Sequence, residues 1–321
     1  MVASGQSGSS DLAARDRAAR SRRIAGILIL SVGAFVFSIQ DTLVKWISGS
    51  YPISQLLAIR SLIGFVPLLI FTHYDGGLRS IRTRRLGALL LRSLMLFLAY
   101  GAYYLAISAV PLAEAVSLYY STPLFIVALS GPLLQERIGL GRWLSVCFGL
   151  IGVIVICKPG AGVFDPAALL AVVSAIFYAA AQVMARMIGP TESASVMSLY
   201  QNAVNCAGAL LLGLLVGSGL YGEADHHPAA QFLLRAWMMP NLVDLLIMLS
   251  TGIIAAIGSW CLAHAYRTTE ATVVAPFEYT AIVWAVLWGF VFWGEVPGLN
   301  TLIGVAMIVV AGFYVLRAAR H

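Results

Sequence analysis

Five ionisable side chains fall inside long apolar stretches of the sequence, where a charge is costly. They are Asp41, Lys45, Arg60, Arg92 and Glu278. If these stretches cross a bilayer, each charge at its centre costs about 2.5 to 3.5 kcal/mol on insertion scales. Each residue therefore needs a partner or a water-filled cavity, and a cavity of that kind is where a polar ligand or a coupling ion would bind.

Glu278 is the first candidate, because it falls about eight residues, or near 12 Å, into its apolar stretch. Its carboxylate can bond a ligand or carry a coupling proton, or it can be a structural acid paired with a neighbouring helix. Asp41 and Lys45 are spaced i and i+4, so they share a helix face and we expect them to pair. Lys45 also lies close enough to an interface to reach it.

Two arginines and a glutamine could line the same cavity. Arg60 lies in the middle of its stretch and Arg92 about six residues into the next, each with a stem long enough to reach a carboxylate or the headgroups instead. Gln40 and Gln182 could hydrogen-bond a polar ligand or each other. The sequence leaves these alternatives open.

Tyrosines complete the candidate site. A flat ring system would need stacking faces and hydroxyl donors in a mostly apolar pocket, which Tyr119, Tyr120 and Tyr279 could supply. The alternative is an aromatic helix seam or an interfacial belt. The candidate ligand-binding residues are therefore Glu278, Tyr119, Tyr120, Tyr279, Arg92, Arg60, Gln40 and Asp41.

Composition decides which solvent surrounds these residues. Of 321 residues, 60% are hydrophobic and 11% charged, and the mean hydropathy is +0.89. Soluble domains carry roughly a quarter charged residues, so this composition indicates an integral membrane protein in contact with lipid. The net charge of +6 comes from basic residues in short connecting segments, which does not favour nucleic-acid binding. The four cysteines lack metal-ligand spacing, and we expect neither a metal nor a cofactor.

Ten apolar stretches are long enough to cross a bilayer, and backbone groups in hydrocarbon are satisfied within helices. The sequence thus predicts an all-α integral membrane fold with ten transmembrane helices, preceded by a disordered cytoplasmic tail over residues 1–22. The expected spans are approximately 24–46, 53–72, 86–107, 112–134, 140–157, 166–187, 193–217, 240–264, 271–293 and 300–317.

Orientation follows from the basic residues between the spans. With both termini cytoplasmic, the inner segments hold about 15 Lys and Arg residues, against Lys158 and Arg235 outside. The odd number of spans in each half means that a duplicated half would insert upside down. We therefore expect two inverted five-helix repeats, residues 23–158 and 166–318.

Matching sequence features support the repeat. The span from Glu114 to Glu136 has a counterpart from Glu270 to Glu295, and a glycine-containing span follows each. Because Glu136 and Glu295 occupy equivalent ends in opposed halves, we expect them to cap helix ends. Pro123 and Pro276 interrupt the backbone hydrogen bonds of these two spans and mark expected hinge points.

The run Tyr120-Ser121-Thr122-Pro123, then Leu134-Gln135-Glu136, with its echo in Ala275-Pro276-Phe277-Glu278 and Trp293-Gly294-Glu295, resembles the EamA-type carriers of the drug/metabolite transporter superfamily. The resemblance implies ten helices in two inverted repeats. It also implies a carrier in the bacterial inner membrane, with a cavity lined by the first, third, fourth, sixth, eighth and ninth spans. The segment Val274–Thr280 is similar to the branch that includes riboflavin importers and S-adenosylmethionine carriers.

Other classes of membrane protein find less support. The sequence contains no HExxH, GxSxG, P-loop or strand-borne GxGxxG motif, so we do not expect an enzyme or an ATP-driven pump. The expected function is alternating-access transport of a small molecule, with riboflavin uptake as the specific hypothesis. Export of amino acids or other small metabolites, or S-adenosylmethionine transport, is the alternative. Transport direction, coupling ion and oligomeric state do not follow from the sequence.

Overall fold

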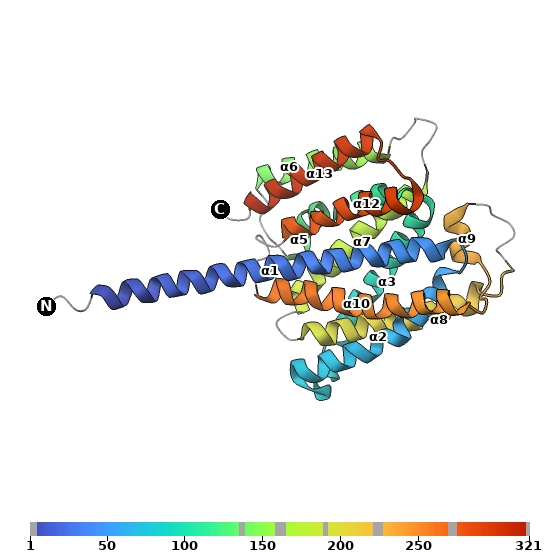
Figure 1. The fold of residues 1–321 in the computed structure, drawn as a ribbon, viewed down its shortest axis with the longest axis horizontal. Helices are drawn as coiled ribbons and strands as arrows, with labels where there is room; N and C mark the ends of the chain where they lie inside the picture. Colours follow the sequence, from blue (N-terminus) through green and yellow to red (C-terminus); the bar gives the residue numbers. More distant parts are fainter. Residues whose placement is uncertain are drawn as a thin grey trace.

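The computed structural model describes residues 5–134, 139–157, 165–188, 192–220, 227–268 and 275–318, and every element within these ranges is helical. Figure 1 shows the helices packed side by side as a bundle. In chain order they are α1 (Gly5–Ser48), α2 (Ile53–Gly76), η1 (Leu78–Ile81), α3 (Leu86–Ala109), α4 (Leu112–Tyr119), α5 (Thr122–Leu134), α6 (Leu140–Cys157), α7 (Ala167–Ile188), α8 (Ala194–Val216), α9 (Pro228–Leu234), α10 (Leu242–Thr268), η2 (Ala275–Tyr279), α12 (Thr280–Trp293) and α13 (Leu299–Ala318).

Within the described ranges, seven helical segments are long and apolar enough to cross a membrane, which makes this a multi-pass membrane protein. They are Ile24–Ser48, Ile53–Asp75, Leu86–Ala109, Leu112–Leu129, Ala167–Ala185, Ala194–Val216 and Leu242–Leu262. Three more apolar helices are shorter, and they are Trp143–Cys157, Phe277–Trp293 and Leu299–Tyr314.

The N-terminal segment differs from the expected disordered tail. The structure continues α1 back to Gly5, and the extension projects well beyond the bundle (Figure 1). Its sequence is rich in alanine and arginine, which are strong helix formers, so the apolar span can propagate a helix into this segment without tertiary contacts.

The fourth and ninth expected spans are not single α-helices. The stretch 112–134 divides into α4 and α5 between Tyr119 and Thr122, and the ninth begins with the 3₁₀ turn η2 before α12 starts at Thr280. At each break a threonine hydroxyl donates to the carbonyl three residues earlier, Thr122 to Tyr119 and Thr280 to Phe277, both at 2.6 Å. These bonds satisfy carbonyls that a broken helix leaves without partners.

Helix contacts in the first half have counterparts in the second. α1 packs against α10 as α7 packs against α3, and α2 packs against α10 as α8 packs against α3. The pairs α2–α8 and α6–α13 each join equivalent elements of the two halves. The packing is therefore approximately unchanged when the two halves are exchanged.

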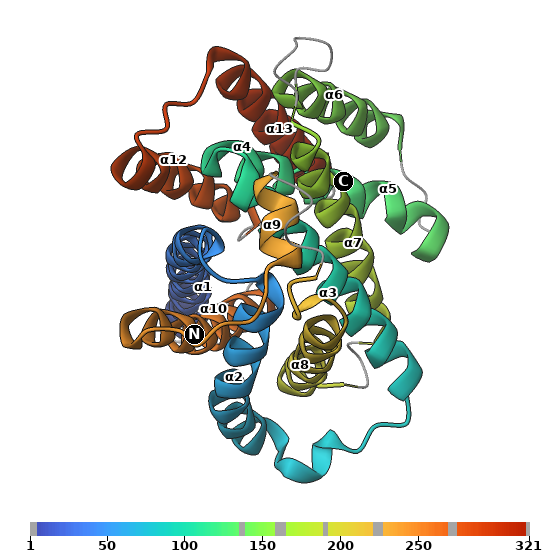
Figure 2. The same ribbon diagram turned by 90° about the vertical axis from the view of Figure 1, so that its right-hand side faces the viewer.

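The short helix α9 covers one end of the bundle. Viewed from that end, opposite the protruding N-terminus, α9 lies over the middle of the helices (Figure 2). It contacts α3 and α2, and its Phe232 is fully buried in the largest hydrophobic cluster of the protein. We refer to this as the α9 end, and to the other as the N-terminal end.

Candidate functional site

A group of tyrosines gathers where the two broken spans meet. Consecutive rings are in contact, with centroids 4.8 Å apart for Tyr103–Tyr119, 5.3 Å for Tyr119–Tyr178 and 6.0 Å for Tyr120–Tyr279. Tyr120 comes from the α4–α5 break and Tyr279 from the end of η2. The tyrosine cluster, as we call it, consists of Tyr100, Tyr103, Tyr104, Tyr119, Tyr120, Tyr178 and Tyr279.

Two polar side chains converge on the hydroxyl of Tyr104. Gln40 donates to it at 2.7 Å, and Arg60 donates to it from α2. The Arg60 guanidinium also lies over the rings of Tyr100 and Tyr104, 5.7 and 5.5 Å from their centroids. The Oε1 of Gln40 is buried, and no described group donates to it. This leaves one acceptor beside the rings for a ligand.

Asp41 and Lys45 do not pair as expected from their spacing. Tyr103 donates to Asp41 at 2.8 Å, whereas the ammonium of Lys45 lies 2.6 Å from Glu295. Glu295 also accepts from the backbone N–H of Leu112, at the start of α4, at 2.8 Å. Lys45 turns to Glu295 because that carboxylate is nearer to it in the folded chain. Glu295 caps a helix as expected, but it caps a helix in the other half, and Glu136 lies outside the described residues.

Glu278 lies beside the tyrosine cluster on η2. Its carboxylate interacts electrostatically with Tyr120, Tyr178 and Tyr279. The break between η2 and α12 places this acid and Tyr279 at the end of a helical segment. Glu278 therefore faces rings contributed by α4 and α7 as well as its own neighbour.

Tyr279 places its ring and its hydroxyl against different neighbours. Its ring contacts Tyr120 and stacks near Phe313 at 6.2 Å, and its hydroxyl lies against Gly312 of α13. A side chain at Gly312 would collide with that hydroxyl. The hydroxyl is buried and has no hydrogen-bond partner among the described residues, so the role of Tyr279 in binding a ligand stays a prediction.

Arg92 lies apart from the ring contacts but is buried, with 8% of its surface exposed. It interacts electrostatically with Tyr100 and Tyr178. Its Nε and Nη1 atoms are buried, and among the described residues neither has a hydrogen-bond acceptor. A buried guanidinium with unused donors is a site where an anionic group would be stabilised.

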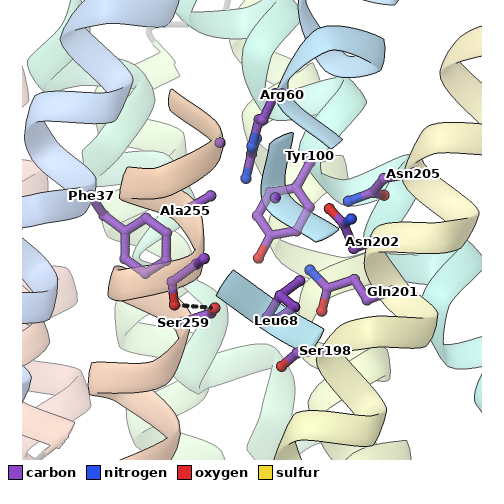
Figure 3. Close-up of a pocket in the computed structure, with 13 residues that line it drawn as sticks. Phe37, Arg60, Leu68, Tyr100, Ser198, Gln201, Asn202, Asn205, Ala255 and Ser259 are labelled. Atoms are coloured by element: carbon purple, nitrogen blue, oxygen red, sulfur yellow. Dashed lines mark hydrogen bonds between the residues drawn. The ribbon is translucent and has the colours of Figure 1, made fainter. Parts of the chain in front are cut away.

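A pocket adjoins the tyrosine cluster and shares Tyr100 with it, and Arg60, which lies over two rings of the cluster, also lines the pocket (Figure 3). The remaining walls come from α1, α2, α8 and α10. Its empty volume is about 430 Å³, which includes the solvent at its open mouth, so the enclosed part is small. The second span, with Arg60, and the seventh, now α8, are walls that the family resemblance does not include.

The sequence reasoning missed Tyr178 as a site residue. This ring contacts both Tyr100 and Tyr119, and its hydroxyl is within hydrogen-bonding reach of Gln182. Gln40 and Gln182 therefore contact tyrosines rather than each other. The available signal was the residue type, because Tyr178 is a tyrosine inside an apolar span, as Tyr119 and Tyr120 are.

The fold and the site together define a multi-pass helical membrane protein with a polar, aromatic centre between two similar halves. The EamA-like transporter family model matches residues 24–158 and 165–317, and the chain belongs to this family.

Individual relatives are similar along nearly their whole length. A riboflavin transporter of Vibrio cholerae is 27% identical over 91% of this chain and 93% of its own. The pseudopaline exporter CntI of Pseudomonas aeruginosa is 29% identical over 89% of this chain and 94% of its own. A solved crystal structure with 21% identity, covering 93% of this chain and 99% of its own, has a TM-score of 0.64, which shows the same fold.

Proposed function

We propose that this protein is a secondary carrier of the bacterial inner membrane that moves a small metabolite by alternating access. In this proposal ten spans form two inverted five-helix repeats, residues 23–158 and 166–318, with both termini cytoplasmic. The exchange of helix contacts between the halves supports the repeat, and the distribution of Lys and Arg supports the orientation.

The observation that carries the proposal is the meeting of two broken helices at the tyrosine cluster. Carriers built from inverted repeats bind their substrates near the bilayer midplane, at the interface of the repeats, where discontinuous helices expose backbone groups. Here Tyr120 from one break contacts Tyr279 from the other, beside Glu278. In this proposal α9, which packs against α3 and α2, lies on the outer side of the site, and the pocket lies toward the cytoplasmic side.

The substrate that we favour contains a flat ring system, and the specific hypothesis is riboflavin entering the cell. Tyr119, Tyr120 and Tyr178 offer aromatic faces, and the unused Oε1 of Gln40 can accept a hydrogen bond from a ring N–H. The similarity to a riboflavin transporter agrees with this chemistry.

A second candidate is export of a metabolite that carries a carboxylate, an amino acid or S-adenosylmethionine included. Arg92 favours it, because the unused donors of a buried guanidinium match a carboxylate better than a neutral ring. The similarity to a pseudopaline exporter agrees with export.

The deciding experiment is uptake of labelled riboflavin by bacteria that can neither make nor import it, with and without this protein, at several pH values. If the protein imports riboflavin, accumulation should be saturable, and unlabelled flavins should compete with the label whereas amino acids should not. If the protein reaches the membrane and no uptake occurs, export replaces riboflavin uptake as the favoured function. The assay then becomes the tolerance of the cells to accumulated metabolites.

Glu278→Gln tests the site within the same assay. Removing the charge next to the rings should lower uptake about tenfold or more, since a hydrogen bond to a charged group contributes roughly 1.5 to 3 kcal/mol. Glu192→Gln, a matched change beyond the site, should leave uptake unchanged. Equal uptake by Glu278→Gln and the unmodified protein, at equal membrane levels, would remove Glu278 from the mechanism.

A further inference from the structure

The pocket beside the tyrosine cluster has one wall made of uncharged polar side chains. Ser198, Gln201, Asn202 and Asn205 are spaced i, i+3, i+4 and i+7 along α8, so they share one helix face. Figure 3 shows them pointing toward the pocket, across from Phe37. A polar face on a membrane helix is stabilised only where neighbouring helices or a ligand take up its hydrogen bonds.

The neighbouring helices take up only part of this hydrogen-bonding capacity. The side chain of Asn202 donates to the backbone carbonyl of Ser61 at 2.9 Å, which fixes its orientation against α2. Asn205 is 6% exposed, and no donor among the described residues reaches its Oδ1. A ligand in this pocket therefore has to supply a donor, and a carboxylate or phosphate dianion cannot do so.

Arg60 is the one cation of the described pocket lining, and its charge is already engaged. It donates to Tyr104, lies over two tyrosine rings and interacts electrostatically with Asp41. An anionic ligand is therefore not required for charge balance. Groups that both donate and accept fit this lining best, and hydroxyls have both capacities.

The pocket borders the tyrosine cluster at Tyr100 and at Arg60, whose guanidinium lies over that ring. A molecule with two chemically different parts could place an aromatic part among the rings and a hydroxyl-bearing part against α8. The pocket lies toward the N-terminal end, because Ser198 is about one turn from the start of α8 and Leu68 about two turns from the end of α2.

We propose that the α8 face of this pocket binds an uncharged, hydroxyl-rich part of the transported molecule, such as a polyol chain, while the tyrosine cluster holds its flat ring. This inference rests on the proposed function, because it assigns the second half of that substrate site. In this proposal the amide side chains of α8 determine specificity for the polyol chain of the substrate, and they do not affect binding of its ring.

The test compares three probes on the purified full-length protein in detergent: riboflavin, lumiflavin and ribitol. Lumiflavin has the same ring with a methyl group in place of the ribityl chain, and ribitol is the chain alone. Flavin affinities come from fluorescence titration, and ribitol binding from the shift in Tm. The unmodified protein should bind riboflavin about tenfold more tightly than lumiflavin, as one or two net hydrogen bonds would give.

Two variants and one control test whether the pocket binds the polyol chain. Asn205→Leu should lower riboflavin affinity about tenfold and leave lumiflavin affinity unchanged. Gln201→Leu should do the same, and because Gln201 is only half-buried, this substitution is less disruptive to folding. Asn300→Leu, an exposed asparagine on α13, should change neither affinity. If both pocket variants weaken the two flavins equally, or weaken neither, the assignment of the chain to this pocket is overturned while the ring site stands.

A different result separates the two proposals. If the unmodified protein binds neither flavin, the riboflavin hypothesis fails, and ribitol alone decides on the pocket. A rise in Tm with millimolar ribitol that Asn205→Leu abolishes would support the polyol assignment, and no rise would overturn it.

Discussion

Contacts between the two halves of the chain occur at both ends of the bundle, and those at the α9 end include an ion pair, whereas those named below for the N-terminal end are hydrogen bonds. The first group includes Lys45–Glu295, Glu295–Leu112, Trp237–Ser54, Tyr51–Asp244 and Arg235–Ser48. The second includes Thr83–Glu192, Ser195–Asp75 and Tyr200–Ile81.

The contacts of the α9 end include a mostly buried ion pair. Lys45 and Glu295 expose only 10% and 21% of their side chains. Desolvation and the neighbouring Asp244 raise the pKa of Tyr51, so its hydroxyl stays protonated and keeps donating. The pocket, by contrast, lies toward the N-terminal end. We therefore expect the α9 end, with this ion pair and the buried Phe232, to contribute more to stability than the N-terminal end, and substitutions at three positions test that expectation.

Phe232→Ala should have the largest effect. This ring is fully buried where α9 meets the bundle, and truncating a buried phenylalanine costs about 3 to 5 kcal/mol. The free energy of unfolding in mixed micelles measures the loss. Phe148→Ala, the same truncation at an exposed position on α6, is the matched control and should cost far less. Equal losses would mean that α9 does not hold its end closed.

Glu295→Gln should follow, at about 3 kcal/mol, because it leaves the mostly buried Lys45 without its charge partner. Glu192→Gln makes the same change at the N-terminal end, where the residue only accepts from Thr83, and should cost about 1 kcal/mol or less. The same unfolding assay compares them. A larger loss from Glu192→Gln would reverse the ranking of the two ends.

Asp165 should give the smallest effect. Its Oδ1 accepts a hydrogen bond from the N–H of Ala167 at the start of α7. The same oxygen lies 3.1 Å from Nε2 of His227, the residue before α9. Asp165→Ala should cost about 1 kcal/mol through the lost cap. Asp165→Asn keeps the acceptor and should cost a few tenths, since partly exposed ion pairs contribute little. If Asn costs as much as Ala, the link to His227 is the main contribution.

The sequence predicted the helical membrane fold because long apolar runs have one solution in lipid. It also singled out Gln40, Asp41, Arg60 and Glu278, which the fold brings to the tyrosine cluster, since each is costly in an apolar run. It did not predict the partner of Lys45, because Glu295 is 250 residues away in sequence and i, i+4 spacing offered a nearer acid.

The sequence indicated an interruption of the fourth span near Pro123 but not the residue at which the helix stops, and it did not indicate the polar face of α8. The break after Tyr119 falls before Pro123, and a proline constrains the residues around it without fixing where a helix stops. The α8 face was not recognised, because serine and amide side chains in an apolar helix cost less than charges and give a weak signal.

The Lys45–Glu295 pair has a consequence for measured affinity. A contact that exists in one conformation only sets the fraction of molecules in that conformation, and apparent affinity scales with the competent fraction. Each 1.4 kcal/mol contributed by this pair changes that ratio about tenfold. Neither residue lies in the tyrosine cluster, yet if the proposed alternating access breaks this pair, the two residues would set how much binding free energy goes into that change, and substrates on the two sides of the membrane would meet sites of unequal apparent affinity.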